Sequence, residues 1–318
     1  MDYLKEYIEK IKSNEIIVSK KIKQFYLNII EPIILDESDK YYYDPSKGEF
    51  FIEFAEHFCK QSNGKWYGKK IKLMLFQKAK YQALLGILDR KTNKRRFKEV
   101  FDVRARKNGK SQENAIFAEF CALVNKGIEI FVAATTFAQA SRVWEETRKM
   151  IETEPNVSKR FKSKIFPEKQ IENLTNKSRF KVLSKNTNSQ DGFNVSIAII
   201  DEVHQLAREV YDLLKQGTSA QPEPILSMIT TAGFVREGLF DDIYNYSKQV
   251  LDGIVEDDTL MPLIYEQDNV EELNNEQLWI KSNPAIDIIK DREFLKQELE
   301  RMQIDKNLAN TVKVKDFN

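Results

Sequence analysis

A junction near residue 105 carries residue types that suit phosphate binding. The stretch Arg104-Ala-Arg-Lys-Asn-Gly109-Lys110-Ser111 separates a short apolar run from an amphipathic one. Backbone amides at the start of a helix bind phosphate oxygens. Lys110 would reach the β- and γ-phosphates of a nucleotide, and the Ser111 hydroxyl would ligate magnesium. The predicted phosphate-binding residues are Lys107, Asn108, Gly109, Lys110 and Ser111. The same letters also occur in an ordinary basic turn, so the context decides the interpretation.

A second group of polar residues ends the apolar run Ser196-Ile-Ala-Ile-Ile-Asp201-Glu202. Asp201 would hold magnesium through water, and Glu202 would orient or deprotonate the attacking water. Arg104 or Arg106 would lie near the phosphates and stabilise charge in the transition state, and the sequence does not distinguish them. Either carboxylate alone could be a solvated strand end. Together, and in this order, the two groups favour a nucleotide hydrolase.

Two weaker signals accompany these groups. Thr230-Thr231-Ala232-Gly233 follows an apolar run, and small hydroxylated residues at this place couple the γ-phosphate to the rest of motors that move along nucleic acid. The alternative is a plain turn closed by Gly233. Gln77 has an amide that offers both a donor and an acceptor to an adenine edge, and Phe76 beside it could stack near the base.

The elements that would position these residues follow from apolar periodicity. Strands are expected at 100–103, 128–134, 180–183, 195–200, 225–229 and 260–265. Helices are expected within 1–40 and at 49–59, 75–88, 111–124, 138–154, 239–251 and 291–303, with a loop from Tyr41 to Gly48. Strands that are apolar throughout and alternate with helices indicate a mainly parallel sheet covered on both faces. Ligands bind at the carboxyl ends of such strands.

Composition narrows the class of protein. The chain has 318 residues, 42% hydrophobic and 31% charged, with a net charge of +1, so nucleic acid would have to bind at a local patch. The segment from Asp89 to Lys110 contains ten basic residues and only three acidic ones. A possible patch for a phosphate backbone is Arg90, Lys91, Lys94, Arg95 and Arg96. Cys59 and Cys121 lack metal-ligand spacing, and no apolar run reaches the roughly 18 residues of a membrane span.

These motifs resemble those of the large terminase subunit of tailed bacteriophages, the motor that packages DNA into procapsids. The stretch Arg106-Lys-Asn-Gly-Lys-Ser111 resembles that family's altered Walker A loop, and Ile199-Ile-Asp-Glu-Val-His204 resembles its Walker B segment. Further similar segments are Ala133-Ala-Thr-Thr136, Gln190-Asp-Gly-Phe193, and Trp279 with Asn283-Pro284. The resemblance covers roughly Leu75 to Pro284. It implies that Gln77 belongs to the adenine motif, and Thr230 and Thr231 to the coupling motif.

The expected fold is therefore an α/β P-loop NTPase domain with a central, mainly parallel sheet. We expect a helical N-terminal segment at 1–48, the ATPase domain at 49–253 and a small linker subdomain at 254–318. The resemblance implies ATP and Mg²⁺ as cofactors. It implies double-stranded DNA, the small terminase subunit and the portal protein as partners, and a homo-oligomeric ring as the active form. It also implies a location in the cytoplasm of the bacterial host, docked on procapsids.

One departure and two alternatives qualify this interpretation. Large terminases carry a nuclease domain after the motor, and the sequence ends where that domain would start, so nuclease activity is not expected of this chain. A helicase-like translocase shares the Walker motifs and an adenine glutamine, but a second helicase domain is not found. A non-catalytic ATP-binding module would have no need of Glu202.

Overall fold

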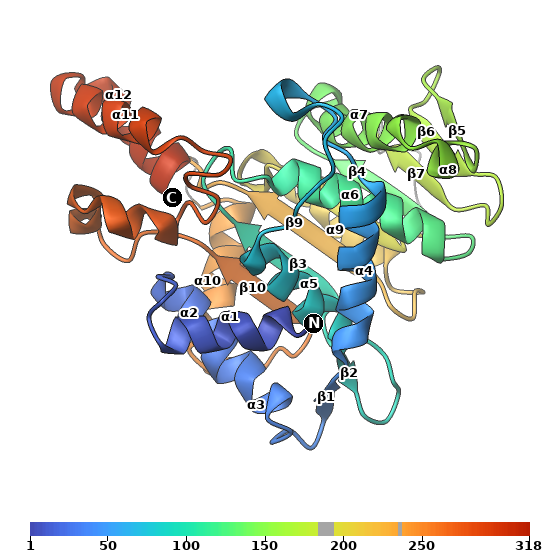
Figure 1. The fold of residues 1–318 in the computed structure, drawn as a ribbon, viewed down its shortest axis with the longest axis horizontal. Helices are drawn as coiled ribbons and strands as arrows, with labels where there is room; N and C mark the ends of the chain where they lie inside the picture. The colour runs from blue at the N-terminus through green and yellow to red at the C-terminus, as the bar shows by residue number, and fades with distance from the viewer. Residues whose placement is uncertain (184–193, 235–236) are drawn as a thin grey trace.

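The computed structural model describes residues 1–183, 194–234 and 237–318, and in this part of the chain eight strands form one sheet (Figure 1). Their order across the sheet is β10-β3-β9-β8-β4-β7-β6-β5. The strands are β3 (Glu99–Val103), β4 (Glu129–Ala133), β5 (Phe161–Lys164), β6 (Gln170–Asn173), β7 (Arg179–Val182), β8 (Ile197–Asp201), β9 (Ile225–Thr230) and β10 (Leu260–Ile264). Neighbours from β10 to β7 are parallel, whereas β6 is antiparallel to β7 and to β5. The expected mainly parallel sheet is confirmed.

Helices cover both faces of this sheet. The chain moves one way across it from β3 through β4 to β7, with α6 (Lys110–Val124) and α7 (Phe137–Thr153) as connections. It moves back from β8 through β9 to β10, with α9 (Arg208–Gly217) and α10 (Leu239–Leu251) between them. Because such crossovers are right-handed, α6 and α7 lie on one face and α9 and α10 on the other. The short helix α8 (Pro155–Ser158) follows α7, and the 3₁₀ turn η4 (Val203–Gln205) follows β8.

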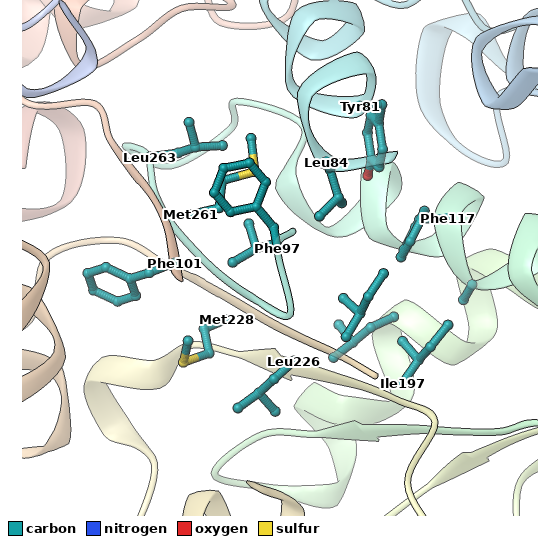
Figure 2. Close-up of a cluster of buried hydrophobic side chains, with 14 of the residues drawn as sticks. Tyr81, Leu84, Phe97, Phe101, Phe117, Ile197, Leu226, Met228, Met261 and Leu263 are labelled. Atoms are coloured by element: carbon teal, nitrogen blue, oxygen red, sulfur yellow. The ribbon is translucent and has the colours of Figure 1, made fainter. Parts of the chain in front are cut away.

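Because β3, β9 and β8 are parallel neighbours, their carboxyl ends lie side by side at one end of the sheet. Val103 is in register with Thr230, and Asp201 is in register with Ile229. All of these residues lie at the carboxyl ends of β3, β8 and β9, where open α/β sheets bind ligands. The strands stay in place because their side chains are buried on both faces. Figure 2 shows Tyr81, Leu84, Phe117 and strand residues such as Leu226 and Met261 in one apolar cluster.

The N-terminal residues pack into the same core as the sheet. This part contains α1 (Tyr3–Lys12), α2 (Lys20–Gln24), the π-helix η1 (Phe25–Ile30), α3 (Glu31–Ile34), α4 (Pro45–Phe58), η2 (Gly64–Trp66) and α5 (Leu75–Gly86). Leu4 and Phe25 share the main cluster with Phe101 and Met261. The Ser19 hydroxyl donates to the Ile264 carbonyl at 2.8 Å, which fastens α2 to the end of β10. The expected division at residue 48 falls inside α4 and stays a prediction.

The loop expected from Tyr41 to Gly48 is wrong. Tyr41–Tyr43 form strand β1, which pairs antiparallel with β2 (Ile87–Asp89), and α4 begins at Pro45. Asp44 caps that helix by accepting from the Ser46 amide, and proline suits a first helical turn. The sequence analysis made no prediction for β5 and β6, which are short and mostly polar, or for α9, although Val210, Tyr211 and Leu214 have helical spacing there. None of the described helices is long and apolar enough to cross a bilayer.

A smaller unit follows the sheet, and Figure 1 shows its helices projecting from one end of the molecule. It contains η5 (Val270–Asn274), η6 (Glu276–Lys281), α11 (Arg292–Ile304), α12 (Lys306–Val312) and the π-helix η7 (Lys313–Phe317). Its separate apolar core is built around Leu273, Trp279, Ile286, Leu295, Val312 and Phe317. The expected boundary at residue 253 precedes β10, which belongs to the main sheet, and this division also stays a prediction.

Gly48 lets α4 and α5 approach closely, because it has no side chain to meet Gln82. A Cβ at Gly48 would lie 2.8 Å from the Gln82 backbone nitrogen, and it would also meet the Gln82 Cα. Gln82 cannot move aside easily, because its amide accepts from the Leu4 N–H and donates to the Met1 carbonyl. Alanine favours a helix by about 1 kcal/mol over glycine, but overpacking typically costs about 1–3 kcal/mol.

We expect Gly48→Ala to lower the free energy of unfolding by about 1–2 kcal/mol, as measured by urea denaturation. Lys47→Ala is the matched control, because Lys47 is the preceding residue of α4 and is exposed. Unchanged or increased stability of Gly48→Ala would show that the two helices are not held at this distance.

Candidate nucleotide-binding site

The loop between β3 and α6 presents a run of unpaired backbone amides. Lys107 and Gly109 have left-handed backbones, with φ of 62° and 77°, and Gly109 caps α6. In the described part of the chain, the N–H groups of residues 107–111 have no hydrogen-bond acceptor. Such a run at a helix N-terminus attracts an anion, because the amides and the helix dipole both present positive charge. The loop therefore has the backbone geometry that suits phosphate binding.

Lys110 closes this loop on itself. Its ammonium group donates to the carbonyl oxygens of Arg104 and Ala105, at the other end of the loop. Burial and the nearby charge of Arg104 lower the pKa of Lys110 to about 7, although Asp201 and Glu202 act against them. A bound phosphate would supply the negative charge that favours the ammonium form. The Ser111 side chain, one residue later, is half-buried.

A neutral network of four buried charges lies beneath the loop. Arg104 forms a two-pronged ion pair with Asp102 at 2.7 and 2.6 Å, and its guanidinium also contacts Glu113 at 3.0 Å. Lys80 of α5 pairs with the same two acids, at 2.8 and 2.6 Å. Burial alone would raise the pKa of Asp102, but Arg104 and Lys80 hold it below its usual range. This network ties α5, β3 and α6 together.

The network separates the two arginines that the sequence left open. The Arg104 guanidinium is fully buried and donates also to the Asn108 carbonyl at 3.2 Å, so it supports the loop from below. The Arg106 side chain is exposed and has no ion pair within the described residues. Lys107 is likewise exposed. Of the two arginines, Arg106 is the one whose guanidinium is free to meet a phosphate.

A cavity of about 430 Å³ opens beside the loop. Its lining includes Ile71, Leu73, Met74, Gln77, Ile116 and Ile289. The Gln77 amide accepts from the Met74 N–H and donates to Glu113, each at 2.9 Å, which leaves one N–H and one lone pair for a ligand. A Cβ at Gly109 would come within 3.7 Å of the Gln77 Nε2 and 3.3 Å of Ile289. Phe76 instead packs against Tyr265, with its ring centroid 5.8 Å away, and does not line this cavity.

Asp201 and Glu202 differ in their surroundings. Asp201 ends β8 and is buried, and burial together with the charge of Glu202 raises its pKa to about 6. A buried carboxylate without an ion pair among the described residues is a ready partner for a cation. Glu202 follows with φ of 59°, an unusual backbone for glutamate, and its amide donates to the Ile229 carbonyl at 2.9 Å. About a third of its side chain is exposed, so the carboxylate is accessible to solvent.

The predicted coupling residues contact the Walker B segment through His204. The His204 Nδ1 lies 2.9 Å from the Thr230 hydroxyl and 3.1 Å from the Glu202 carboxylate. Thr230 in turn donates to the Thr231 carbonyl at 2.7 Å. A Cβ at Gly233 would lie 2.7 Å from the His204 Cβ, so the glycine makes room for this ring. The structure thus brings Glu202, Thr230 and Thr231 together.

The smaller C-terminal unit holds the loop from its other side, which sequence reasoning missed. The Asn108 amide donates to the Asn283 side chain and accepts from the Ala285 N–H, both at 3.0 Å. The Ala105 amide donates to the Ser282 carbonyl. Lys315 also lies against His204. The Asn283-Pro284 motif was visible in the sequence without its contact, whereas Lys315 carried no signal at all.

Other sequence predictions have mixed outcomes. Ala133 ends β4, and Thr136, three residues later, caps α7 together with Gln139. The Gln190-Asp-Gly-Phe193 segment lies outside the described residues.

The proposed basic patch is wrong for two of its members. Arg95 is bound to Glu223 and Arg96 to Asp258, and both side chains are mostly buried. Lys91 and Lys94 remain exposed.

Comparisons with known proteins agree with this geometry. Residues 75–249 match the model of the family described as "Terminase large subunit, ATPase domain". The terminase large subunit of Lactococcus phage p2 is 26% identical over 318 residues, which cover 98% of this chain and 57% of that protein. Protein YmfN of Escherichia coli (strain K12) is 33% identical over 129 residues, 40% of this chain and 28% of that protein. The chain thus spans little more than half the length of the phage p2 relative.

A solved structure extends the likeness to the fold. The large terminase of bacteriophage HK97 superposes with a TM-score of 0.73 at 21% sequence identity, over 85% of this chain and 55% of that one. At 21% sequence identity this match shows that the fold is similar and nothing more. The family match covers more than half of the chain, and it contains the phosphate loop, the Asp201-Glu202 pair and the coupling threonines. The chain therefore belongs to the terminase large subunit family and carries that family's ATPase domain.

Proposed function

We propose that this chain hydrolyses ATP to drive double-stranded DNA into a viral procapsid. The observation that carries the proposal is the run of unpaired amides at 107–111, with Lys110 among them and the Asp201-Glu202 pair on the same edge of the sheet. The amides and Lys110 bind the phosphates, and the carboxylates serve the hydrolytic step. The membership of the terminase family supports the link to DNA packaging.

Glu202 is proposed to orient or deprotonate the attacking water. Its carboxylate is partly exposed, next to the buried Asp201, and it is held by the His204 ring. Arg106 is proposed to stabilise charge on the phosphates in the transition state, because its guanidinium is not committed to a carboxylate. Arg104 acts through its ion pairs by keeping the loop in shape.

Ser111 and Asp201 are proposed to hold magnesium. A hydroxyl and a carboxylate are hard oxygen ligands of the kind that Mg²⁺ prefers. Burial and the charge of Glu202 raise the pKa of Asp201, and a bound cation would favour its carboxylate form. Magnesium would neutralise charge on the phosphate oxygens. Gln77 is proposed to read the adenine edge from the wall of the cavity, and Thr230 and Thr231 to transmit the state of the γ-phosphate.

The partners are proposed from the family. They are double-stranded DNA, the small terminase subunit and the portal protein, and we propose that the active form is a homo-oligomeric ring. The site of action is proposed to be the cytoplasm of the bacterial host, on procapsids. The residues that contact DNA are not assigned, since Arg95 and Arg96 are occupied within the fold.

Replacement of Lys110 tests the phosphate loop. We expect Lys110→Ala to abolish ATP turnover and to weaken ATP binding sharply, because it removes the cation nearest the loop amides without touching the core. Calorimetric titration with ATP and a phosphate-release assay measure the two effects. Lys126→Ala, an exposed lysine beyond the far end of α6, is the control. Normal turnover by Lys110→Ala would exclude this loop as the phosphate site.

Replacement of Glu202 separates chemistry from binding. Glu202→Gln keeps the shape of the side chain but removes its charge. Assistance by a general base is worth about 10²–10⁴-fold, so we expect single-turnover hydrolysis to slow by at least about a hundredfold. ATP affinity should stay near that of the wild type, because the group acts mainly in the transition state. Glu209→Gln, an exposed glutamate in α9, is the control, and wild-type hydrolysis by Glu202→Gln would remove the catalytic assignment.

The choice of nucleic acid tests the packaging motor against its alternatives. We expect double-stranded DNA of any sequence to accelerate ATP turnover, with an apparent affinity that falls steeply as salt rises, because the contacts are to phosphates. The measurement is ATP turnover with duplex DNA, single-stranded DNA and RNA at two salt concentrations. Stimulation by single strands alone would favour a helicase-like translocase. Nucleotide binding without any turnover would favour a non-catalytic module.

A further inference from the structure

Lys315 places a buried positive charge beside the hydrolytic residues. It belongs to η7, and the residue is only 3% exposed. Its ammonium lies 2.6 Å from the His204 Nε2, and it donates to the Thr231 hydroxyl and the Ala232 carbonyl, both at 3.2 Å. No carboxylate pairs with it within the described residues. All of its close partners are neutral acceptors, so the lysine is held there by the ring and the coupling motif.

This contact decides which nitrogen of His204 carries the proton. An ammonium group can only donate, so the Nε2 atom that faces it must offer its lone pair. The proton between the two groups stays on lysine, because a lysine is more basic than an imidazole by about 4 pKa units. Burial and the charge of Lys315 also lower the pKa of His204 to about 4, which keeps the ring neutral. The ring's single N–H is therefore at Nδ1.

The Nδ1–H points to the residues that matter for hydrolysis. The Thr230 hydroxyl is 2.9 Å away and the Glu202 carboxylate is 3.1 Å away. Since Thr230 uses its own proton for the Thr231 carbonyl, it can accept from the ring. In the other tautomer, Nδ1 would turn a lone pair toward the carboxylate and repel it. The tautomer imposed by Lys315 is the one that holds Glu202 in place.

We propose that Lys315 is a positioning residue for ATP hydrolysis, which fixes His204 as the Nδ1–H tautomer and thereby holds the Glu202 carboxylate at the site. The inference rests on the proposed role of Glu202. Lys315 acts through His204 and is not assigned a contact with the nucleotide.

The position of Lys315 at His204 depends on how the C-terminal unit is anchored. Lys290 pairs with Asp316 at 2.7 Å, and the Asn283 amide donates to the Asp316 carbonyl at 2.8 Å. The Lys315 carbonyl accepts from the Arg106 amide of the phosphate loop at 2.9 Å. The same short helix is thus anchored in the small C-terminal core and on the nucleotide loop. Any separation of the two would withdraw Lys315 and free the His204 ring.

Kinetics of Lys315→Met test the functional half of the proposal. Methionine keeps the length and the apolar stem but loses the charge. We expect kcat to fall by about 10- to 100-fold with the KM for ATP within about threefold, since a misplaced catalytic group costs rate of this order. Lys313→Met makes the same change two residues away on the exposed side of η7, and should retain wild-type rates. Lys315→Arg keeps a donor-only cation and should recover part of kcat.

The tautomer is measured directly by ¹⁵N NMR of the histidine ring, which needs no activity. The chain has two histidines, so His57→Gln leaves the signals of His204 alone. We expect the Nδ1–H form in the wild type and in Lys315→Arg, and a mixture or the Nε2–H form in Lys315→Met. An Nε2–H ring in the wild type, or an unchanged ring in Lys315→Met, would overturn the proposal. So would an unchanged kcat in Lys315→Met while Glu202→Gln is inactive. Full activity of Glu202→Gln would instead overturn the proposed function.

Discussion

The Asp102–Arg104 ion pair and its partners Lys80 and Glu113 hold the nucleotide site together. Four charges removed from water are costly unless each finds its partner, and loss of one member leaves an uncompensated charge inside the protein, at a cost of about 3–5 kcal/mol. Here each acid meets both cations, so only one arrangement of α5, β3 and α6 satisfies all four. The phosphate loop starts at Arg104, so the ion pairs of this residue fix the position where the loop begins. Gln77, which donates to Glu113, joins the adenine side of the site to the same network.

The loop is fixed from a second direction by residues far along the chain. Asn108 is held by Asn283 and Ala285, and the Arg106 amide is held by the Lys315 carbonyl. The ion pairs of Arg104 described above come from the main sheet and its helices. The contacts of Asn283, Ala285 and Lys315 come from a unit with its own small core. The phosphate loop is therefore contacted both by the main sheet with its helices and by the C-terminal unit, which has a separate apolar core.

Apolar periodicity predicted the sheet and the helices that carry the site. Buried strands such as Ile197–Asp201 consist of apolar residues, and amphipathic helices such as Leu239–Leu251 have apolar residues on the buried face. The hairpin of β5 and β6 was missed, since no residue of β5 is buried and β6 buries only Ile171 and Asn173, too few apolar positions to show a period. Asp102 offered an overlooked signal, because a carboxylate inside an apolar strand must have a partner. Lys315 could not be found, since nothing in its neighbours distinguishes a lysine that turns inward from one that faces water.

The bond between Ser19 and Ile264 has a consequence for how the chain acquires its fold. The two residues are 245 positions apart, so α2 cannot reach its final place until nearly the whole sheet exists. During synthesis α2 and η1 leave the ribosome before β3 and β10, so apolar side chains such as Phe25 then lack their eventual neighbours in the sheet. Contacts of such long range make folding slow. The α2 segment is thus made well before β10 but is buried only together with it, and through that interval its apolar surface is exposed to chaperones and to other copies of the chain.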